Sequence, residues 1–449
     1  TGIQNSVVKP IEPVFVDFSR DMSKFSLTEG AEVLYKKNEL NDIFSVQMVY
    51  NCGTQQDPAL GLAMNYLSYL GTPDMSAEQM ASRMYALACS YSGGAGTTQS
   101  SIRVSGLSEN MAEAVRLVED LVRNAEPDEA ILAALKADML KSRADANKAQ
   151  SSCFSALQRY IYYGPEFVKA TNLSDAALMA LTSEELLAKV RAVFGLGHEI
   201  LYYGPMSETE VKAALKDAHY VAEGAKMVPE QHPLQQVTPS DRVVMAQYDA
   251  AQIYYIQYSD RGETFDAASA GDIALYNEYF GGGMNTIVFQ EMREARGLAY
   301  SAQAILNEPS YKDDTYFFRA FIATQNDKMR QAIEAFDEII NDMPESEAAF
   351  SVAKEALLSR LRTQRTTGMN VLRSYLACRN LGLSEPADRA VFEKAQNATL
   401  ADVTATQQKW VKDRHYTFAI LGDIKDLDTK FLATLGPVQV VSLDEIFGY

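Results

Sequence analysis

Two segments of the chain carry the same pattern of apolar and polar positions. "NMAEAVRLVEDLVRNAEPDEA" begins at Asn110 and "KMRQAIEAFDEIINDMPESEA" begins at Lys328, so a shift of 218 positions aligns them. In both segments the apolar residues recur every three or four positions. This spacing predicts an amphipathic helix with one buried face in each segment.

The same shift aligns a second pair of segments. "ILYYGPM" (200–206) falls on "FAILGDI" (418–424), and both are typical of a short buried strand that ends at a glycine. The segments 44–51 and 251–259 are rich in β-branched and aromatic residues, which predicts two further strands. One shift that holds over several segments indicates two copies of one unit of roughly 210 residues.

The order of the elements indicates the fold class. The predicted helices follow one another in groups and do not alternate with single strands, which favours an α+β fold. We therefore expect two tandem homologous domains, 14–222 and 242–449, each with a mostly antiparallel mixed sheet packed with helices. The segment 223–241 holds three prolines and no apolar periodicity, so it is expected to be a linker.

Charge and hydropathy exclude two classes of partner. The net charge is −18 and lysine and arginine form no cluster, whereas a nucleic-acid binder needs a basic surface against the phosphates. No apolar run approaches the roughly 18 residues that cross a bilayer. The opening "TGIQNSVVKPIEP" is a polar, linker-like segment and not a signal peptide. We interpret it as a start within a longer or processed protein.

The cysteines and histidines predict no metal site. The cysteines form no C-x-x-C pair and are expected to be apolar core residues. Zinc needs three or four converging ligands, and the histidines are scattered singly along the chain. The residues concerned are Cys52, Cys89, Cys153, Cys378, His198, His219, His232 and His415.

The segment with the most obvious chemistry is "GGGMNTIVFQEMREARGLAY", which runs from Gly281 to Tyr300. Its glycines predict a tight strand-to-helix turn. No Lys-Ser/Thr pair follows them and no G-x-G-x-x-G is present, so a nucleotide loop is excluded.

Arg293 carries a permanent planar cation and Tyr300 a single hydroxyl donor. Gly297 is expected to end the helix, so that Tyr300 starts a strand. Arg296 is expected to make only surface or inter-domain ion pairs.

This segment resembles the signature of the second domain in the pitrilysin/insulinase family of zinc peptidases, which includes mitochondrial processing peptidase. The resemblance covers nearly the whole chain, with two tandem domains, the glycine-rich loop and the R…GLAY segment. It implies that Arg293 and Tyr300 hydrogen-bond a peptide substrate and stabilise the oxyanion at a zinc site in an opposing half. It also implies that the glycine-rich loop lies near the substrate, through Gly281, Gly282 and Gly283.

The zinc-binding part of the family pattern is missing from the matching segment "GLAMNYLSYLGT" (61–72). Zinc-binding relatives carry His-x-x-Glu-His there, and this chain has Met64 and Ser68 at the histidine positions and Leu67 at the glutamate position. No acid lies at 142–144, where the family's third ligand falls. Thioether and hydroxyl groups are poor zinc ligands, and leucine can move no proton. We therefore expect no metal in this chain and zinc in its partner half.

These features favour one hypothesis over two others. The chain is interpreted as the non-catalytic half of a zinc metalloendopeptidase, inactive alone, that closes the chamber and contributes Arg293 and Tyr300. The catalytic half is either part of the same longer chain or the other subunit of a heterodimer. The alternative is a purely structural or interaction subunit of the same fold, like the core proteins of the cytochrome bc1 complex. A metal-independent hydrolase lacks any Ser–His–Asp or Cys–His context. The resemblance to bacterial relatives suggests the periplasm.

Overall fold

The computed structural model describes residues 9–449, which divide into two compact units. The N-terminal unit consists of Phe18–Leu234, Thr367–Ser374 and Ser442–Tyr449. The C-terminal unit consists of the described residues up to Asp17, with Gln235–Thr366 and Tyr375–Val441. Two short segments from the second half of the sequence thus join the first unit.

A six-stranded mixed sheet forms the centre of the N-terminal unit, in the order β1-β2-β6-β3-β5-β4. Strands β2 and β6 are parallel, and every other neighbouring pair is antiparallel. The strands are β1 (Ser23–Thr28), β2 (Ala31–Lys37), β3 (Ile43–Tyr50), β4 (Cys89–Ala95), β5 (Ser100–Leu107) and β6 (His198–Gly204).

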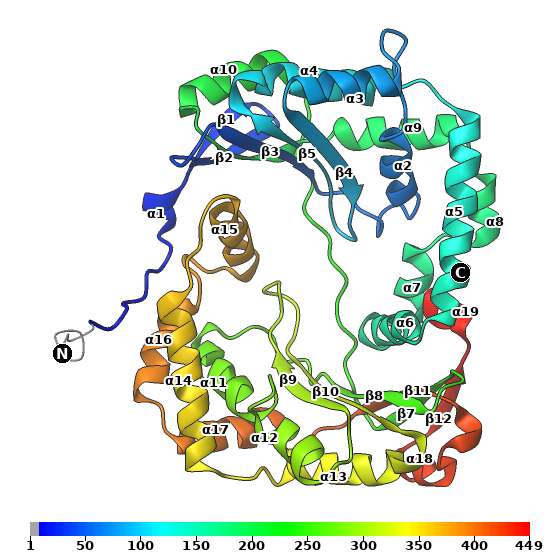
Figure 1. Cartoon of the computed structure of the whole chain (residues 1–449), viewed down its shortest axis with the longest axis vertical. Helices are drawn as coiled ribbons and strands as arrows, with labels where there is room; N and C mark the ends of the chain where they lie inside the picture. The colour runs from blue at the N-terminus through cyan, green and yellow to red at the C-terminus, as the bar shows by residue number, and fades with distance from the viewer. Residues whose placement is uncertain (1–8) are drawn as a thin grey trace, which may run out of the picture. The chain divides into compact units, whose positions relative to one another are not determined.

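Helices cover this sheet, and Figure 1 shows α4 and α10 lying across one of its faces. The apolar stripe of α4 packs against the sheet because its residues recur at helical spacing and are buried, whereas the opposite side is polar. The helices of the unit are α1 (Phe18–Asp21), α2 (Leu60–Leu67), α3 (Ala77–Ala86), α4 (Met111–Asn124), α5 (Glu129–Lys148), α6 (Gln150–Tyr163), α7 (Pro165–Thr171), α8 (Asp175–Ala180), α9 (Ser183–Phe194), α10 (Glu208–Ala218) and α19 (Leu443–Phe447).

The C-terminal unit contains a second six-stranded sheet, in the order β12-β7-β11-β8-β10-β9. Here β7 is parallel to both β11 and β12, and the remaining pairs are antiparallel. The strands are β7 (Arg242–Gln247), β8 (Gln252–Ser259), β9 (Ser301–Asn307), β10 (Phe317–Gln325), β11 (Thr417–Gly422) and β12 (Val438–Val441).

Helices also pack on this second sheet, and α13 lies against β10 (Figure 1). The helices are α11 (Ala270–Phe280), α12 (Ile287–Phe289), α13 (Met329–Asn341), α14 (Glu347–Thr363), α16 (Asp388–Asn397), α17 (Leu400–Thr406) and α18 (Thr429–Leu435). Helix α15 (Met369–Leu381) contains the junction between the two units at Ser374 and Tyr375.

The two sheets confirm the duplication that the sequence predicts. The run β2-β6-β3-β5-β4 recurs as β7-β11-β8-β10-β9 with the same strand directions. The amphipathic helices α4 and α13 begin at Met111 and Met329, again 218 positions apart. The sixth strand differs, because β1 lies antiparallel on β2 whereas β12 lies parallel on β7. The α+β class with mixed, mostly antiparallel sheets is therefore confirmed.

The segment 219–241 between α10 and β7 contains neither helix nor strand, and the units divide within it, after Leu234. Each unit has a hydrophobic core of its own on its sheet. Within the described part of the chain, none of the helices combines the length and apolarity needed to span a bilayer.

Candidate functional site

The Arg/Tyr segment lies entirely in the C-terminal unit. After α11 and the glycine-rich loop, the chain forms α12 and a π-helical turn, η3 (Gln290–Ala295). Gly297 then adopts a left-handed backbone with φ of 61°, which ends the helical segment as the sequence predicts. Tyr300 directly precedes β9, and its backbone N–H donates to the carbonyl oxygen of Ala323 at 2.8 Å.

Arg293 lies on the surface of this unit, with its side chain 51% exposed. Its guanidinium carbon stands 5.1 Å from the centre of the Phe289 ring, and its Nε lies 4.0 Å from a carboxylate oxygen of Glu294. An exposed ion pair at this distance contributes little. The cation is therefore held near Phe289 while its planar donors stay on the outside of the unit.

Tyr300 is 53% exposed, and its hydroxyl oxygen accepts a hydrogen bond from Nε2 of Gln325 at 2.8 Å. Because the amide supplies the proton of that bond, the phenol proton of Tyr300 is left for a different acceptor. In residues 9–449, no hydrogen bond joins Arg293 to Tyr300. Both groups thus face outward from neighbouring parts of one anchored segment.

Arg296 behaves as the sequence predicts. Its guanidinium lies 3.6 Å from a carboxylate oxygen of Glu291 and 3.5 Å from one of Glu338. These are surface ion pairs within one unit.

At two positions of the glycine-rich loop the structure leaves no room for a side chain larger than that of glycine. A Cβ at Gly281 would lie 2.3 Å from the carbonyl oxygen of Ala304, and one at Gly282 would lie 2.7 Å from that of Asn277. Gly283 has open space around its Cβ position. The expected tight turn is present, but it joins α11 to α12, so the prediction of a strand before it is wrong. The residues before Gly281 are helical because their apolar side chains pack between the sheet and α14.

Two of the three positions of the family's zinc motif lie in the core of the N-terminal unit. Met64 and Leu67 on α2 are 2% and 3% exposed. The methyl group of Met64 packs on β4, 3.2 Å from where a Cβ of Gly93 would lie. Ser68 is exposed, and its hydroxyl donates to the carbonyl oxygen of Asn65 at 2.6 Å. This donor set does not fit a zinc ion, and across residues 9–449 no group of three or more histidine, cysteine or acidic side chains is arranged so that it could hold a metal ion.

Three of the four cysteines lie in the interior of the protein. Cys89, Cys153 and Cys378 are buried, as expected for core residues, and Cys52 is half-buried. Two of the histidines, His198 and His219, are in contact in the fold although they are 21 positions apart in the sequence. No motif in the sequence signals this pair.

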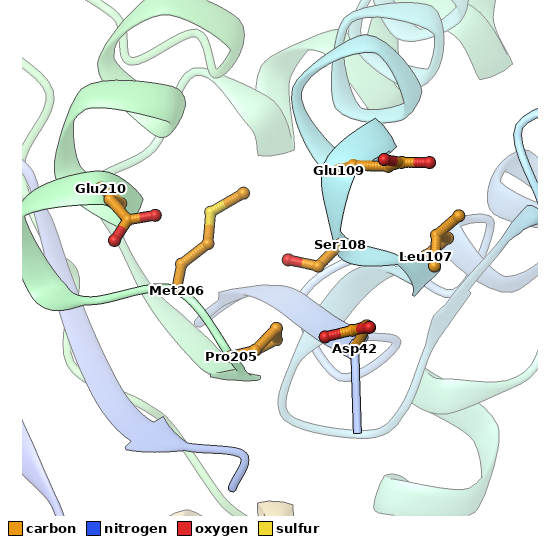
Figure 2. Close-up of a pocket in the computed structure, with 7 residues that line it drawn as sticks. All are labelled: Asp42, Leu107, Ser108, Glu109, Pro205, Met206 and Glu210. Carbon is orange, nitrogen blue, oxygen red and sulfur yellow. The ribbon is translucent and has the colours of Figure 1, made fainter. Parts of the chain in front are cut away.

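A pocket of about 540 Å³ in the N-terminal unit is a further feature that sequence reasoning missed (Figure 2). Carboxylates from three separate loops and helix ends line it together with a serine hydroxyl and apolar side chains. The lining residues are Asp42, Leu107, Ser108, Glu109, Pro205, Met206 and Glu210. The sequence shows no sign of this pocket because its members converge only after the sheet has formed.

Comparison with known structures shows which proteins share this fold. The chain shares its fold with the peptidase M16 inactive domain from Pseudomonas fluorescens, at 18% identity and a TM-score of 0.69, over 90% of this chain and 98% of that one. Residues 199–357 also match the sequence model of the peptidase M16 inactive domain. The family-model match over residues 199–357 and the M16-like fold of the structural neighbours are both consistent with the resemblance to a non-catalytic half of the pitrilysin/insulinase family that the sequence shows.

Two longer proteases share the fold as well. The periplasmic protease PqqL from Escherichia coli is 13% identical with a TM-score of 0.70, and 92% of this chain covers 46% of it. The ferredoxin protease FusC, solved in complex with Arabidopsis ferredoxin, is 12% identical with a TM-score of 0.70, and 93% of this chain covers 48% of it. This chain thus spans about half the length of both proteases. A comparison with curated protein sequences finds no significant match.

Proposed function

We propose that this chain is the non-catalytic half of a zinc metalloendopeptidase of the M16 family. It closes the reaction chamber and presents Arg293 and Tyr300 to a peptide substrate, while zinc is bound by a partner half that carries His-x-x-Glu-His. That partner is either a separate subunit or another part of a longer chain. Because one neighbour in the structural comparison is a periplasmic protease, we extend the proposal to a periplasmic location.

The proposal rests on the exposure and the hydrogen bonding of the Arg293 and Tyr300 side chains. Arg293 and Tyr300 are each about half exposed although they lie on an anchored helix-to-strand segment, and Tyr300 keeps a proton to donate. A guanidinium and a phenol can both donate to a peptide carbonyl oxygen, whose negative charge grows as water adds to the carbon. Donors fixed before the reaction stabilise that charge without reorganising.

The glycine-rich loop supports a contact with substrate at one position only. Gly281 and Gly282 are explained by their close approach to Ala304 and Asn277. Gly283 has open space instead, so a peptide backbone can approach it closely. We therefore propose Gly283 as the member of the loop that faces the substrate.

The zinc-motif positions give the proposal its first test. Since Met64, Leu67 and Ser68 cannot form a zinc site, we expect the purified chain to cleave no peptide, with or without added Zn²⁺. Peptide libraries analysed by mass spectrometry, with the metal content measured alongside, check this. Cleavage by the isolated chain that tracks its zinc content would contradict the assignment as a non-catalytic half.

A further inference from the structure

Three ionisable side chains form a continuous chain of contacts in the core of the N-terminal unit. His198 opens β6, His219 follows the end of α10, and Glu119 lies on the sheet-facing side of α4. Their exposures are 0%, 7% and 8%. Three elements far apart in the sequence therefore meet at one buried polar row.

The contacts run in a fixed order. Nδ1 of His198 lies 3.0 Å from the carbonyl oxygen of Leu196. Nε2 of His198 lies 2.6 Å from Nε2 of His219. Nδ1 of His219 contacts a carboxylate oxygen of Glu119.

Each of these three contacts needs one proton, because two bare lone pairs repel at such distances. The Leu196 carbonyl can only accept, so Nδ1 of His198 carries a proton. One proton lies between the two Nε2 atoms, and one lies between His219 and Glu119. Two neutral imidazoles and an ionised carboxylate supply only two protons for the three contacts. We infer that Glu119, His219 and His198 form a buried binding site for one additional proton.

The additional proton makes the row electrically neutral, because its charge cancels that of the Glu119 carboxylate. A neutral row is far cheaper to bury than an uncompensated carboxylate. The proton count holds whichever atom of the His219–Glu119 contact carries the proton, and so does the neutrality.

The surroundings place the additional proton at the His219–Glu119 end. The pKa of His198 is lowered to about 4, chiefly by burial and then by repulsion from His219, while the hydrogen bond to Leu196 opposes both effects. His198 therefore stays the neutral member and accepts from Nε2 of His219.

On the elements packed around the row, no other described charged group takes the place of the proton in balancing the Glu119 carboxylate. On β3, the Tyr50 ring lies against the His198 ring at a tilt, with centroids 4.4 Å apart, and burial followed by the Glu119 charge raises the pKa of the Tyr50 hydroxyl well above the usual value. Glu199, next to His198 on β6, belongs to the opposite face because side chains alternate along a strand. At the surface between α4 and the end of α10, the charged groups are already in contact with other side chains. These contacts are Arg116 with Asp217 and Arg123 over the Tyr220 ring.

The site makes folding of this unit depend on pH in both directions. Free histidine titrates near pH 6.5, so above about that pH the unfolded chain loses both imidazolium protons while the folded row keeps one. Stability then falls as pH rises, by up to about tenfold in the unfolding equilibrium constant per pH unit. Between about pH 6.5 and 4 the unfolded chain holds two protons and the folded row one, so stability falls as pH drops. The contribution therefore peaks near pH 6.5 and disappears on either side.

Nitrogen NMR of the full chain labelled with ¹⁵N-histidine counts these protons directly. At about pH 7.5 we expect three protons in total on the four ring nitrogens of His198 and His219 and the Glu119 carboxyl, with the ring signals assigned from His219→Gln and the state of the carboxyl read from its ¹³C shift. Two protonated ring nitrogens, one on each ring, together with an ionised Glu119 carboxyl, would overturn the inference. This readout does not depend on a folded His219→Gln variant. The chain has four histidines, so substituting His232 and His415 identifies their signals and leaves those of His198 and His219.

Urea unfolding across the same pH range tests the consequence. Above pH 6.5 the unfolding equilibrium constant should change by up to about tenfold per pH unit, towards lower stability, in the native chain and in His415→Gln. His415→Gln is a matched control because the His415 side chain is 63% exposed. It should vanish in His219→Gln. Equal slopes in the native chain and His219→Gln would contradict a bound proton.

Discussion

Replacing Arg293 with alanine and Tyr300 with phenylalanine together lowers the turnover of the reconstituted peptidase by about 10²–10³-fold, the usual cost of losing oxyanion donors. The reason is that, in the proposed function, both side chains donate to an oxygen whose charge develops only as water adds. An interaction made in the transition state alone changes kcat and kcat/KM by the same factor and leaves KM in place. Steady-state kinetics of the pair of halves, with a fluorogenic peptide, measures the split.

Arg296→Ala is the matched control for that experiment. Arg296 lies in the same segment and carries the same charge, but it contacts Glu291 and Glu338 on the surface. Its removal should leave turnover unchanged and stability within about 0.5 kcal/mol. If the Arg293→Ala, Tyr300→Phe chain supports full activity, the two groups have no catalytic part and the structural-subunit hypothesis takes precedence.

Rebuilding the family's zinc motif with Met64→His, Leu67→Glu and Ser68→His should unfold or severely destabilise the N-terminal unit. Removing a buried methionine or leucine side chain costs about 2–5 kcal/mol each, and the new carboxylate at position 67 would be buried without a partner. The sum approaches the whole stability of a typical domain, about 5–15 kcal/mol. Denaturant midpoints measure the loss.

Two single substitutions serve as controls for this triple change. Ser68→His alone, at an exposed position, should alter stability by about 0.5 kcal/mol or less, and Leu67→Met, which keeps the volume, by less than about 1.5 kcal/mol. A triple variant that folds like the parent and takes up one Zn²⁺ would show that the site lacks only its ligands. That result would contradict the description of α2 as a committed core helix.

The local patterns in the sequence predict much of the fold. The amphipathic spacing that begins near Met111 and Met329 identifies α4 and α13, because burial of one stripe is a local consequence of helical period. The strands β3 and β8 follow from their β-branched and aromatic content. The sixth strand of each sheet could not be predicted this way. Which segment pairs with β2 or β7 at the edge depends on long-range contacts that no local pattern records.

The candidate site could likewise be predicted only in part from the sequence. The motif identifies Arg293 and Tyr300, and Gly297 ends the helical segment as expected. The hydrogen bond from Gln325 to Tyr300 was not predictable, since Gln325 lies on a different strand. The row of Glu119, His219 and His198 was missed for the same reason. Its members are up to 100 positions apart, and only the packing of α4 on the sheet joins them.

The most direct measurement is the peptidase activity of the isolated His-x-x-Glu-His half at fixed concentration as this chain is added. If this chain completes the reaction chamber, turnover rises from near zero and reaches a plateau at one chain per catalytic half. The Arg293→Ala, Tyr300→Phe chain should bind with the same stoichiometry and reach a plateau about 10²–10³-fold lower. Turnover that does not change when the native chain is added would contradict the account.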